Sequence, residues 1–488
     1  MVNGDIYTWE ASSDKGYSIG LSLKTLIENG LPNHHPPKSL DELLEQMLKL
    51  INESSNEWGG SITFNSFDNH ITPFLESEKP SKQRFIDQIE NFNKGIDAEK
   101  EVIITLDLIP RVGFPSSGKT QVILDAANGV ILDTYRSRME KGLFEPYFKV
   151  NLYSETDWNS QTLSKCFELS YKFGQPTYQN FITGTISPET LRPREFNPNS
   201  EVMYLRLGGV LGNSDNQSVI GYTCINLENI SLEAKNEEEF YQYLDEKVAA
   251  AVSTLMKKRE KVEAKFNSGK MPITRHFLDD MNWSFSVISI LGMNEALENL
   301  IDAPIGHVAG KAVAYKVIEY LLRKLEIVQI DTGKLFSLEA YPSEMPSAIL
   351  MDEYDSEHIC LTPATDLKSS HGDDLWDVLE HQKRYHSMYT GGTLMQIHLA
   401  KGLNYNNELK LLIQRTIDTF GYNYLAITPV FSLCPDHGYV SGKQKCPECG
   451  NKTETFTRID NKTIPISSLP EQLKEAYRRR VYYDVKNQ

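Results

Sequence analysis

Three cysteines and one histidine near the C-terminus have the spacing of a metal site. The segment reads Cys434-Pro-Asp-His437 and then, after eight intervening residues, Cys446-Pro-Glu-Cys449. Two such hooks can surround one tetrahedral ion. Proline after each leading cysteine and glycine after each hook suit the tight turns that the hooks need. Because three thiolates and one imidazole in a closed set favour Zn²⁺, the sequence predicts a structural zinc site at these four residues.

A second segment has the spacing of a phosphate-binding loop. Residues 113–120, GFPSSGKT, satisfy the pattern G-x-x-x-x-G-K-[ST] and stand between a strand-like run and a helix-like run, as that pattern requires. Backbone N–H groups at such a helix start would hold phosphates, and Lys119 would add positive charge. However, Pro115 removes one N–H group, and no apolar run ending in aspartate follows at a suitable distance. We therefore favour an exposed turn and keep the phosphate loop as the alternative.

The remaining sequence supplies the elements that must position these groups. Runs rich in β-branched and aromatic residues predict buried strands, at 101–109, 202–211, 219–227 and 422–431. Apolar residues at helical spacing predict long helices, at 39–58, 121–142, 237–266 and 310–327. Strands that alternate with helices over most of the chain predict an α/β architecture.

Composition restricts the class of protein. With 40% hydrophobic and 24% charged residues, the 488-residue chain has the composition of a globular protein. We expect no membrane segment, because no run reaches about 18 apolar residues, and no signal peptide. A net charge of −16 argues against a general nucleic-acid surface. Six cysteines, three of them in the hooks, indicate a reducing cytosol, so we expect a cytoplasmic protein.

Five segments in collinear order resemble the catalytic subunit of the anaerobic (class III, glycyl-radical) ribonucleoside-triphosphate reductases. They are NEWGGSITFNSFDNHITPF at 56–74, IGYTCINLENISLEA at 220–234, LGMNEAL at 291–297, the run ending YTGGTLMQIHL at 373–399, and the two hooks at 434–450. The resemblance covers almost the whole chain. It implies a ten-stranded α/β barrel with a C-terminal zinc-binding segment, a homodimer, and nucleoside triphosphates as ligands.

The same resemblance leads us to expect three parts of the chain. These are a reductase-like barrel at 1–430, a zinc segment at 431–457 and a C-terminal tail at 458–488. Residues Gly4-Asp5-Ile6 resemble the family's G-D-I-H-I-H-D. We therefore expect the family's N-terminal ATP-sensing domain and first barrel elements to be absent from this chain.

The family's radical glycine has no counterpart. The family pattern after the hooks is E-V-Y-S-R-V-x-G-Y-x-R-P, and here Arg458 and Pro465 keep the register while Asn461 stands at the glycine position. A glycyl radical is planar and has no side chain to block access. Because residues 451–488 contain no glycine, a shift of one or two positions does not restore one.

Three further features of the reacting centre are also missing. The family's thiyl cysteine would fall near 192–203, yet residues 167–223 contain no cysteine. Cys224 occupies a strand-like run, where a small buried hydrophobic residue is the favoured interpretation. The family's glycine-rich, substrate-facing segment corresponds to 94–101, and its Y-T-N-S-T to LTPAT at 361–365. We therefore expect no catalytic residue in this chain and no need for a radical-generating activase.

One segment remains a candidate for nucleotide binding. In Tyr389-Thr-Gly-Gly-Thr393, two glycines let the backbone approach phosphates and the threonines can donate hydrogen bonds. The resemblance assigns nucleotide binding to Thr390, Gly391, Gly392 and Thr393, and a tight turn or bulge is an equal alternative. The overall prediction is a catalytically degenerate homologue that keeps zinc and nucleotide binding and has a regulatory or scaffold role. An active reductase with displaced radical residues and a purely structural assembly protein are the alternatives.

Overall fold

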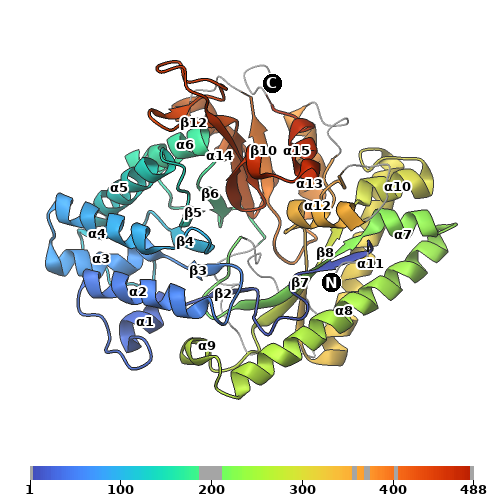
Figure 1. Ribbon diagram of the computed structural model, residues 1–488, viewed down its shortest axis with the longest axis horizontal. Coiled ribbons are helices and arrows are strands. Elements are labelled where there is room, and N and C mark those ends of the chain that lie inside the picture. Colours follow the sequence, from blue (N-terminus) through green and yellow to red (C-terminus); the bar gives the residue numbers. More distant parts are fainter. Residues whose placement is uncertain (1–3, 186–210, 354–359, 368–373, 401–404, 484–488) are drawn as a thin grey trace.

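The computed structural model describes residues 4–185, 211–353, 360–367, 374–400 and 405–483 (Figure 1). Within them, ten strands follow the order β10-β11-β6-β5-β4-β3-β2-β7-β8-β9, and β1 pairs with β7 beside this path. The strands are β1 (Ile6–Thr8), β2 (Ser18–Gly20), β3 (Ile62–Phe64), β4 (Val102–Leu106), β5 (Tyr147–Leu152), β6 (Thr177–Asn180), β7 (Ser218–Asn226), β8 (Ser284–Leu291), β9 (Leu335–Glu339), β10 (Met395–Leu399) and β11 (Tyr424–Pro429).

The two ends of this path meet, so the sheet closes into a barrel. Glu339, at the end of β9, forms a parallel bridge with Gly391, just before β10. The Tyr341 N–H also donates to the Gly392 carbonyl at 2.8 Å. The predicted ten-stranded α/β barrel is therefore confirmed, and the expectation that the first barrel elements are absent is wrong, because the described strands alone close the ring of ten.

The described barrel consists of two sets of parallel strands. Strands β2 to β6 run in one direction, and β7 to β11 run in the other. Antiparallel pairing joins the two sets at β2 with β7 and at β6 with β11. Helices cover the outside of the ring (Figure 1). Because both faces of the sheet are covered, most residues of the ring strands are buried, as the β-branched runs predict, and in β10 Gln396 and His398 are only partly buried.

The helices follow the strands along the chain and pack on the outer face. They are α1 (Leu23–Asn29), α2 (Leu40–Ser54), α3 (Phe67–Glu78), α4 (Lys82–Gly95), α5 (Thr120–Met139), α6 (Gln161–Phe173), α7 (Leu227–Glu233), α8 (Glu237–Asn267), α9 (Pro272–Phe277), α10 (Met293–Ile301), α11 (Val308–Thr332), α12 (Glu344–Glu353), α13 (Leu375–His386), α14 (Lys410–Phe420) and α15 (Glu471–Arg478). Ser39 caps the N-terminus of α2, because its hydroxyl accepts a hydrogen bond from the Glu42 N–H at 3.2 Å.

Side chains alternate between the outer face and the interior of the barrel. On β5, Phe148 packs on Tyr135 of α5 with ring centroids 4.1 Å apart, whereas Lys149 and Asn151 take the opposite, inward direction that the two-residue period requires. The interior is therefore polar as well as enclosed. The strand predicted at 202–211 lies outside the described residues except for residue 211. The cysteine position expected at 192–203 lies wholly outside them.

A smaller sheet follows the barrel. In the described residues its order is β13-β12-β14-β15, with β12 (Phe431–Cys434), β13 (Gly438–Val440), β14 (Glu454–Ile459) and β15 (Lys462–Pro465). Rings of Phe144 and Phe173 pack on Phe431 at 6.0 and 5.6 Å and fix this sheet to the ends of α5 and α6. Strand β14 crosses the expected division at 457/458, and the division into three parts remains a prediction. No helix in the described ranges has the length and apolar content to cross a lipid bilayer.

The segment Asn56-Glu57-Trp58 holds α9 against the barrel. The buried Glu57 carboxylate accepts from the N–H groups of Ile273 and Thr274 at 3.0 and 2.8 Å, and from the Thr274 hydroxyl at 2.6 Å. The Trp58 indole N–H donates to the same hydroxyl at 2.8 Å. This family motif thus has a structural role as a carboxylate cap on a short helix.

Glu57→Gln should destabilise the protein. Glutamine keeps one acceptor oxygen and turns an NH₂ group toward backbone donors, so we expect a loss of about 2–3 kcal/mol in the free energy of unfolding. Urea denaturation followed by tryptophan fluorescence measures it. Glu53→Gln, on the exposed face of α2, should change stability by less than about 0.5 kcal/mol. Equal effects of the two substitutions would contradict the capping role.

Candidate functional site

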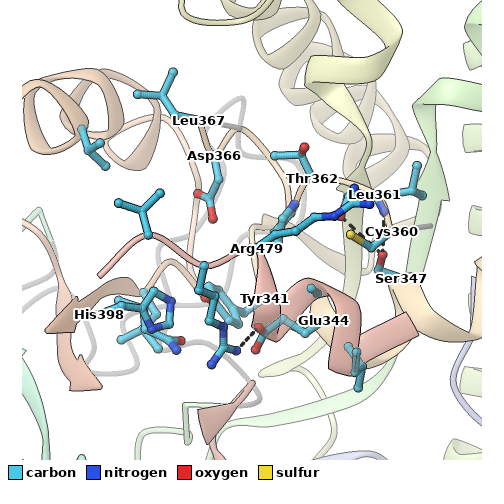
Figure 2. Close-up of a pocket in the computed structure, with 18 of the residues that line it drawn as sticks. Tyr341, Glu344, Ser347, Cys360, Leu361, Thr362, Asp366, Leu367, His398 and Arg479 are labelled. Atoms are coloured by element: carbon cyan, nitrogen blue, oxygen red, sulfur yellow. Dashed lines mark hydrogen bonds and ion pairs between the residues drawn. The ribbon is translucent and has the colours of Figure 1, made fainter. Parts of the chain in front are cut away.

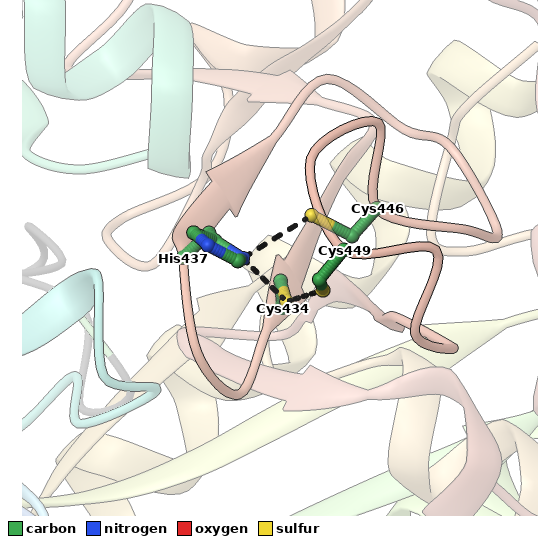
Figure 3. A group of neighbouring side chains, drawn as sticks. All are labelled: Cys434, His437, Cys446 and Cys449. Atoms are coloured by element: carbon green, nitrogen blue, oxygen red, sulfur yellow. Dashed lines mark hydrogen bonds between the residues drawn. The ribbon is translucent and has the colours of Figure 1, made fainter.

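Cys434, His437, Cys446 and Cys449 form one cluster at the edge of the small sheet (Figure 3). One ligand atom from each lies within 4.8 Å of all the others. Cys434 Sγ is 3.6 Å from Cys449 Sγ, and His437 Nδ1 is 3.6 Å from Cys446 Sγ. A tetrahedral ion with metal–sulfur bonds of about 2.3 Å has sulfur–sulfur edges of about 3.8 Å. The four residues predicted from sequence therefore come together in a group that could hold a metal ion.

The surroundings of the cluster suit a structural site. His437 points Nδ1 at the thiols, and its Nε2 lies 3.5 Å from the Glu448 carboxylate, which is the usual arrangement around a metal-bound imidazole. The glycines after the hooks, Gly438 and Gly450, have φ values of 70° and 73°, which glycine adopts without strain. The donor set, three thiolates and one imidazole, leaves no open position for a substrate.

The β14–β15 hairpin carries Asn461 into the barrel region. Asp460 and Asn461 form its two-residue connection, between the paired residues Ile459 and Lys462. Asp460 has φ 48°, and Asn461 is 3% exposed. The Cys/His cluster and the position of the expected radical glycine therefore belong to the same small sheet.

The hairpin tip is fastened to the segment that follows β9. The Asp460 carboxylate accepts from the N–H groups of Ser343 and Glu344, both at 3.1 Å, at the start of α12. In return, Glu344 Oε2 accepts from the Asp460 N–H at 2.8 Å, and Glu344 Oε1 accepts from Arg480 at 2.6 Å. Burial, and then the nearby Glu344, raise the pKa of Asp460 to about 6. Sequence reasoning missed this capping contact, because it joins residues far apart in the chain.

Cys224 faces the same region from β7. Its Sγ lies 3.5 Å from the Pro342 carbonyl, and the side chain is fully buried. Burial, and then the charge of Asp460, hold the pKa of this thiol well above its usual range. A protonated thiol among apolar neighbours behaves as a small hydrophobic residue, as the sequence predicts for Cys224.

The Thr390–Thr393 segment lies at the closure of the barrel. The Thr390 hydroxyl accepts from the Leu338 N–H at 3.0 Å and donates to the Leu338 carbonyl at 3.3 Å. Gly392 has φ 60°, and a Cβ there would lie 2.4 Å from Glu339 Oε2. Both contacts are what a tight closing turn requires. Nucleotide binding by Thr390, Gly391, Gly392 and Thr393 remains a prediction.

A cavity of about 240 Å³ lies beside this closure (Figure 2). Its walls come from α12, α13, β10, α15 and residues 360–367. The LTPAT segment contributes Leu361, Thr362 and Pro363. Glu295 of the GMNEAL motif positions it, because its carboxylate accepts from the Thr362 hydroxyl at 2.6 Å and from the Thr362 N–H at 3.3 Å. Two segments that resemble the family therefore build one wall.

Polar side chains converge on this cavity. Burial, and then Glu344, raise the pKa of Asp366 to about 7, and Gln382 donates to its carboxylate. Burial, and then Arg480, lower the pKa of His398 well below its usual value, so its imidazole is neutral. Gln396 lines the same wall, with its amide nitrogen and oxygen buried and without a partner among the described residues. A neutral imidazole, a carboxamide and a readily protonated carboxyl group can all recognise a neutral hydrogen-bonding ligand.

The sequence analysis did not select these cavity residues. Their signal was the alternation in MQIHL at 395–399, where polar Gln396 and His398 interrupt an apolar strand. The alternative phosphate loop at 113–120 forms an exposed turn before α5. There the Thr120 hydroxyl accepts from the Ser117 N–H at 2.7 Å, and the Ser117 hydroxyl donates to the Glu76 carboxylate at 2.8 Å. A carboxylate at this loop disfavours phosphate, in keeping with the turn interpretation.

Known proteins place the chain in a family. The family model described as anaerobic ribonucleoside-triphosphate reductase matches residues 1–482. The anaerobic ribonucleoside-triphosphate reductase of Haemophilus influenzae is 24% identical over 306 residues, a match that spans 53% of this chain and only 40% of that relative. A solved anaerobic ribonucleotide reductase has a TM-score of 0.80 at 18% identity, covering 99% of this chain and 83% of the other. The Thermotoga maritima enzyme, solved with dATP and CTP, has a TM-score of 0.79 at 17% identity, covering 97% and 84%. This chain belongs to the anaerobic ribonucleoside-triphosphate reductase family.

Proposed function

We propose that this protein is a catalytically degenerate member of its family that binds a nucleoside triphosphate, holds a structural Zn²⁺ ion and has a regulatory or scaffold role. The observation that carries the proposal is Asn461 at the tip of the β14–β15 hairpin, where the resemblance places the radical glycine. A buried asparagine carries a Cβ and a polar amide, and its Cα radical lacks the open, planar environment of glycine.

The state of the neighbouring thiol supports the same reading. Cys224 on β7 has a buried thiol that is hydrogen-bonded to the Pro342 carbonyl, and burial holds its pKa well above the usual range, so it stays protonated. The segment at 361–365 offers a leucine, a proline and an alanine where the family has tyrosine, asparagine and serine. We therefore propose that no radical-generating activase acts on this chain. The family resemblance also supports a homodimer.

Nucleotide binding is supported by the chemistry of the cavity beside the barrel closure. The Gln396 carboxamide can pair with the donor and acceptor edge of a base, and Asp366 and His398 offer further hydrogen bonds from opposite walls. Leu394 and Met395, which follow Thr393 directly, line this cavity. The predicted Thr390–Thr393 segment would thus lie next to the bound nucleotide. The related Thermotoga maritima enzyme has been solved with dATP and CTP.

A thermal-shift series with the eight common ribo- and deoxyribonucleoside triphosphates tests this proposal. Binding to the folded state alone stabilises by about 2.7 kcal/mol at a ligand concentration of 100 Kd. We therefore expect at least one triphosphate at millimolar concentration to raise Tm by several degrees. Gln396→Ala should abolish that rise, whereas Gln83→Ala, on the exposed face of α4, should keep it. An unchanged Tm with all eight triphosphates would reject nucleotide binding.

A further inference from the structure

Lys149 is a buried cation without a partner. It projects from β5 into the barrel, is 1% exposed, and its Nζ has no hydrogen-bond partner among the described residues. Within the same residues, no carboxylate forms an ion pair with it. An isolated ammonium removed from water is costly, so such a group either becomes neutral or takes up an anion.

Hydroxyl groups flank Lys149 on both neighbouring strands. Thr105 of β4 and Thr177 of β6 are its direct cross-strand partners. The Thr105 hydroxyl accepts from the Ser66 N–H at 2.7 Å, and the Thr177 hydroxyl accepts from Arg458 Nη1 at 2.9 Å. Because each hydroxyl already accepts a hydrogen bond, its own proton is available for donation. On this level of the barrel wall, Lys149 therefore lies between two hydroxyl-bearing residues, and its Nζ extends beyond hydrogen-bond distance of both.

Arg458 brings a second buried cation to this level. It is 2% exposed, its Nη2 donates to the Gly174 carbonyl at 3.0 Å, and its Nε has no partner in the described part of the chain. Its hydrogen bonds go to a hydroxyl and a carbonyl, and no carboxylate lies within ion-pair distance among the described residues. Arg458 donates to the Thr177 hydroxyl and Lys149 is the strand neighbour of Thr177, so two buried basic side chains adjoin this threonine without an ion pair among the described residues.

The chain also keeps space for the ammonium. Gly212 has φ 106°, and a Cβ at this residue would lie 2.9 Å from Lys149 Nζ and 3.0 Å from Thr63 Oγ1. On another side, the Tyr424 ring centroid is 5.1 Å from Nζ, a distance at which an aromatic face attracts a cation. The absence of a side chain at Gly212 thus leaves room for the ammonium, and the Tyr424 ring attracts it.

We propose that Lys149, Arg458 and the hydroxyls of Thr105 and Thr177 form an anion site inside the barrel that takes the phosphate chain of a ligand. This inference rests on the proposed function in one respect only, namely that the phosphate chain belongs to a nucleotide. Phosphate oxygens accept from ammonium, guanidinium and hydroxyl donors together, and they supply the negative charge that the two cations lack.

The charge state of Lys149 gives the site a pH dependence. Burial lowers the pKa of Lys149 to about 7, below the usual value of about 10.4 in the unfolded chain. The unfolded chain therefore binds more protons, and this group makes the free protein more stable as pH rises from about 7 to about 10. Phosphate binding needs the ammonium, so the affinity for phosphate should fall as pH rises above 7.

Tripolyphosphate, without any nucleoside, is the probe that tests the site. At pH 6.5 we expect 1 mM tripolyphosphate to raise Tm by several degrees, and at pH 9 to raise it much less. Lys149→Met should lose the rise, and Lys149→Arg should restore it. Lys258→Met is the matched control and should keep the rise. Burial also lowers the pKa of Lys258, to about 8, but its Nζ donates to the Glu10 carbonyl at 2.8 Å.

The possible outcomes separate this proposal from the proposed function. A full tripolyphosphate shift in Lys149→Met would overturn the anion site. A nucleotide shift that survives in Lys149→Met would also overturn it, while nucleotide binding would stand. A tripolyphosphate shift that depends on Lys149, with no shift from any nucleoside triphosphate, would support the anion site and reject nucleotide binding.

The fold of the variant can be checked without a ligand. Lys149→Met removes an unpaired buried charge, so its Tm without phosphate should equal or exceed that of the wild type. A second readout uses the wild-type chain produced with ¹³Cε-labelled lysine. The resonance that Lys149→Met removes should titrate near pH 7 and move to higher pH with tripolyphosphate. A resonance that titrates near pH 10 in both conditions would contradict the proposal.

Discussion

Cys446→Ser should release the metal and unfold the small sheet of β12 to β15. A serine oxygen is a poor replacement for a thiolate in a zinc cage, and binding of structural Zn²⁺ to such sets contributes about 10–16 kcal/mol to folding of isolated zinc domains. In this larger protein we expect at least about 3 kcal/mol of local destabilisation. Metal analysis should fall from about one Zn²⁺ per chain to near zero, and hydrogen exchange should accelerate in residues 431–465.

A second cysteine provides the control for this experiment. Cys360 lies in the 360–367 segment at the cavity, outside the metal cluster. Cys360→Ser should therefore keep the zinc content and the slow exchange of β12 to β15. A Cys446→Ser protein with unchanged zinc content would rule out the closed four-ligand site. Zinc loss without faster exchange would show that the sheet is stable without its metal.

Radical ribonucleotide reduction should be absent from this protein. Under anaerobic conditions with a radical-generating activase, we expect no glycyl signal in electron paramagnetic resonance and no deoxynucleotide product. Loss of residues that act as a catalytic unit lowers turnover by factors approaching 10⁶, so the rate should lie at least about 10⁴-fold below that of an active family member. Asn461→Gly should also give no product, because residues 167–223 contain no cysteine to form the thiyl radical.

An active family member assayed with the same activase is the positive control. It establishes that the activase and reductant work under these conditions. A deoxynucleotide product from the wild-type chain would support displaced radical residues and refute the degenerate assignment. In that case Cys224→Ala would show whether this buried thiol carries the reaction, since its truncation would abolish the product.

Local chemistry explains which features could be predicted from the sequence. The Cys/His cluster was predictable because its four members lie within sixteen consecutive residues, so the spacing alone keeps them close together. The cap of α2 by Ser39 is local in the same way. The β-branched runs indicate where the barrel strands lie, but predicting the order of the strands in the ring required the family resemblance.

The cavity and the anion site could not be predicted, because they depend on contacts between distant segments. Asp366 and Gln396 reach one cavity from different elements, and the alternation in MQIHL marks Gln396 as unusual without showing which residues it meets. Lys149 stands in YFKVNL, where a lysine in a buried strand is a signal in itself. Its significance became clear only when the strand register placed it between Thr105 and Thr177.

The junction between β9 and β10, where the ring closes, can act as a clasp, that is, a contact that opens and closes as a unit. Several junctions of the described ring are short, and this one depends on a few bonds, including those from Thr390 N–H to the Leu338 carbonyl at 3.1 Å and from Tyr341 N–H to the Gly392 carbonyl at 2.8 Å. Releasing it breaks fewer hydrogen bonds than parting a full-length ladder. The clasp also adjoins the cavity, so a ligand there would fasten it. The amides of Thr390 and Tyr341 should thus report occupancy of the cavity through slower hydrogen exchange.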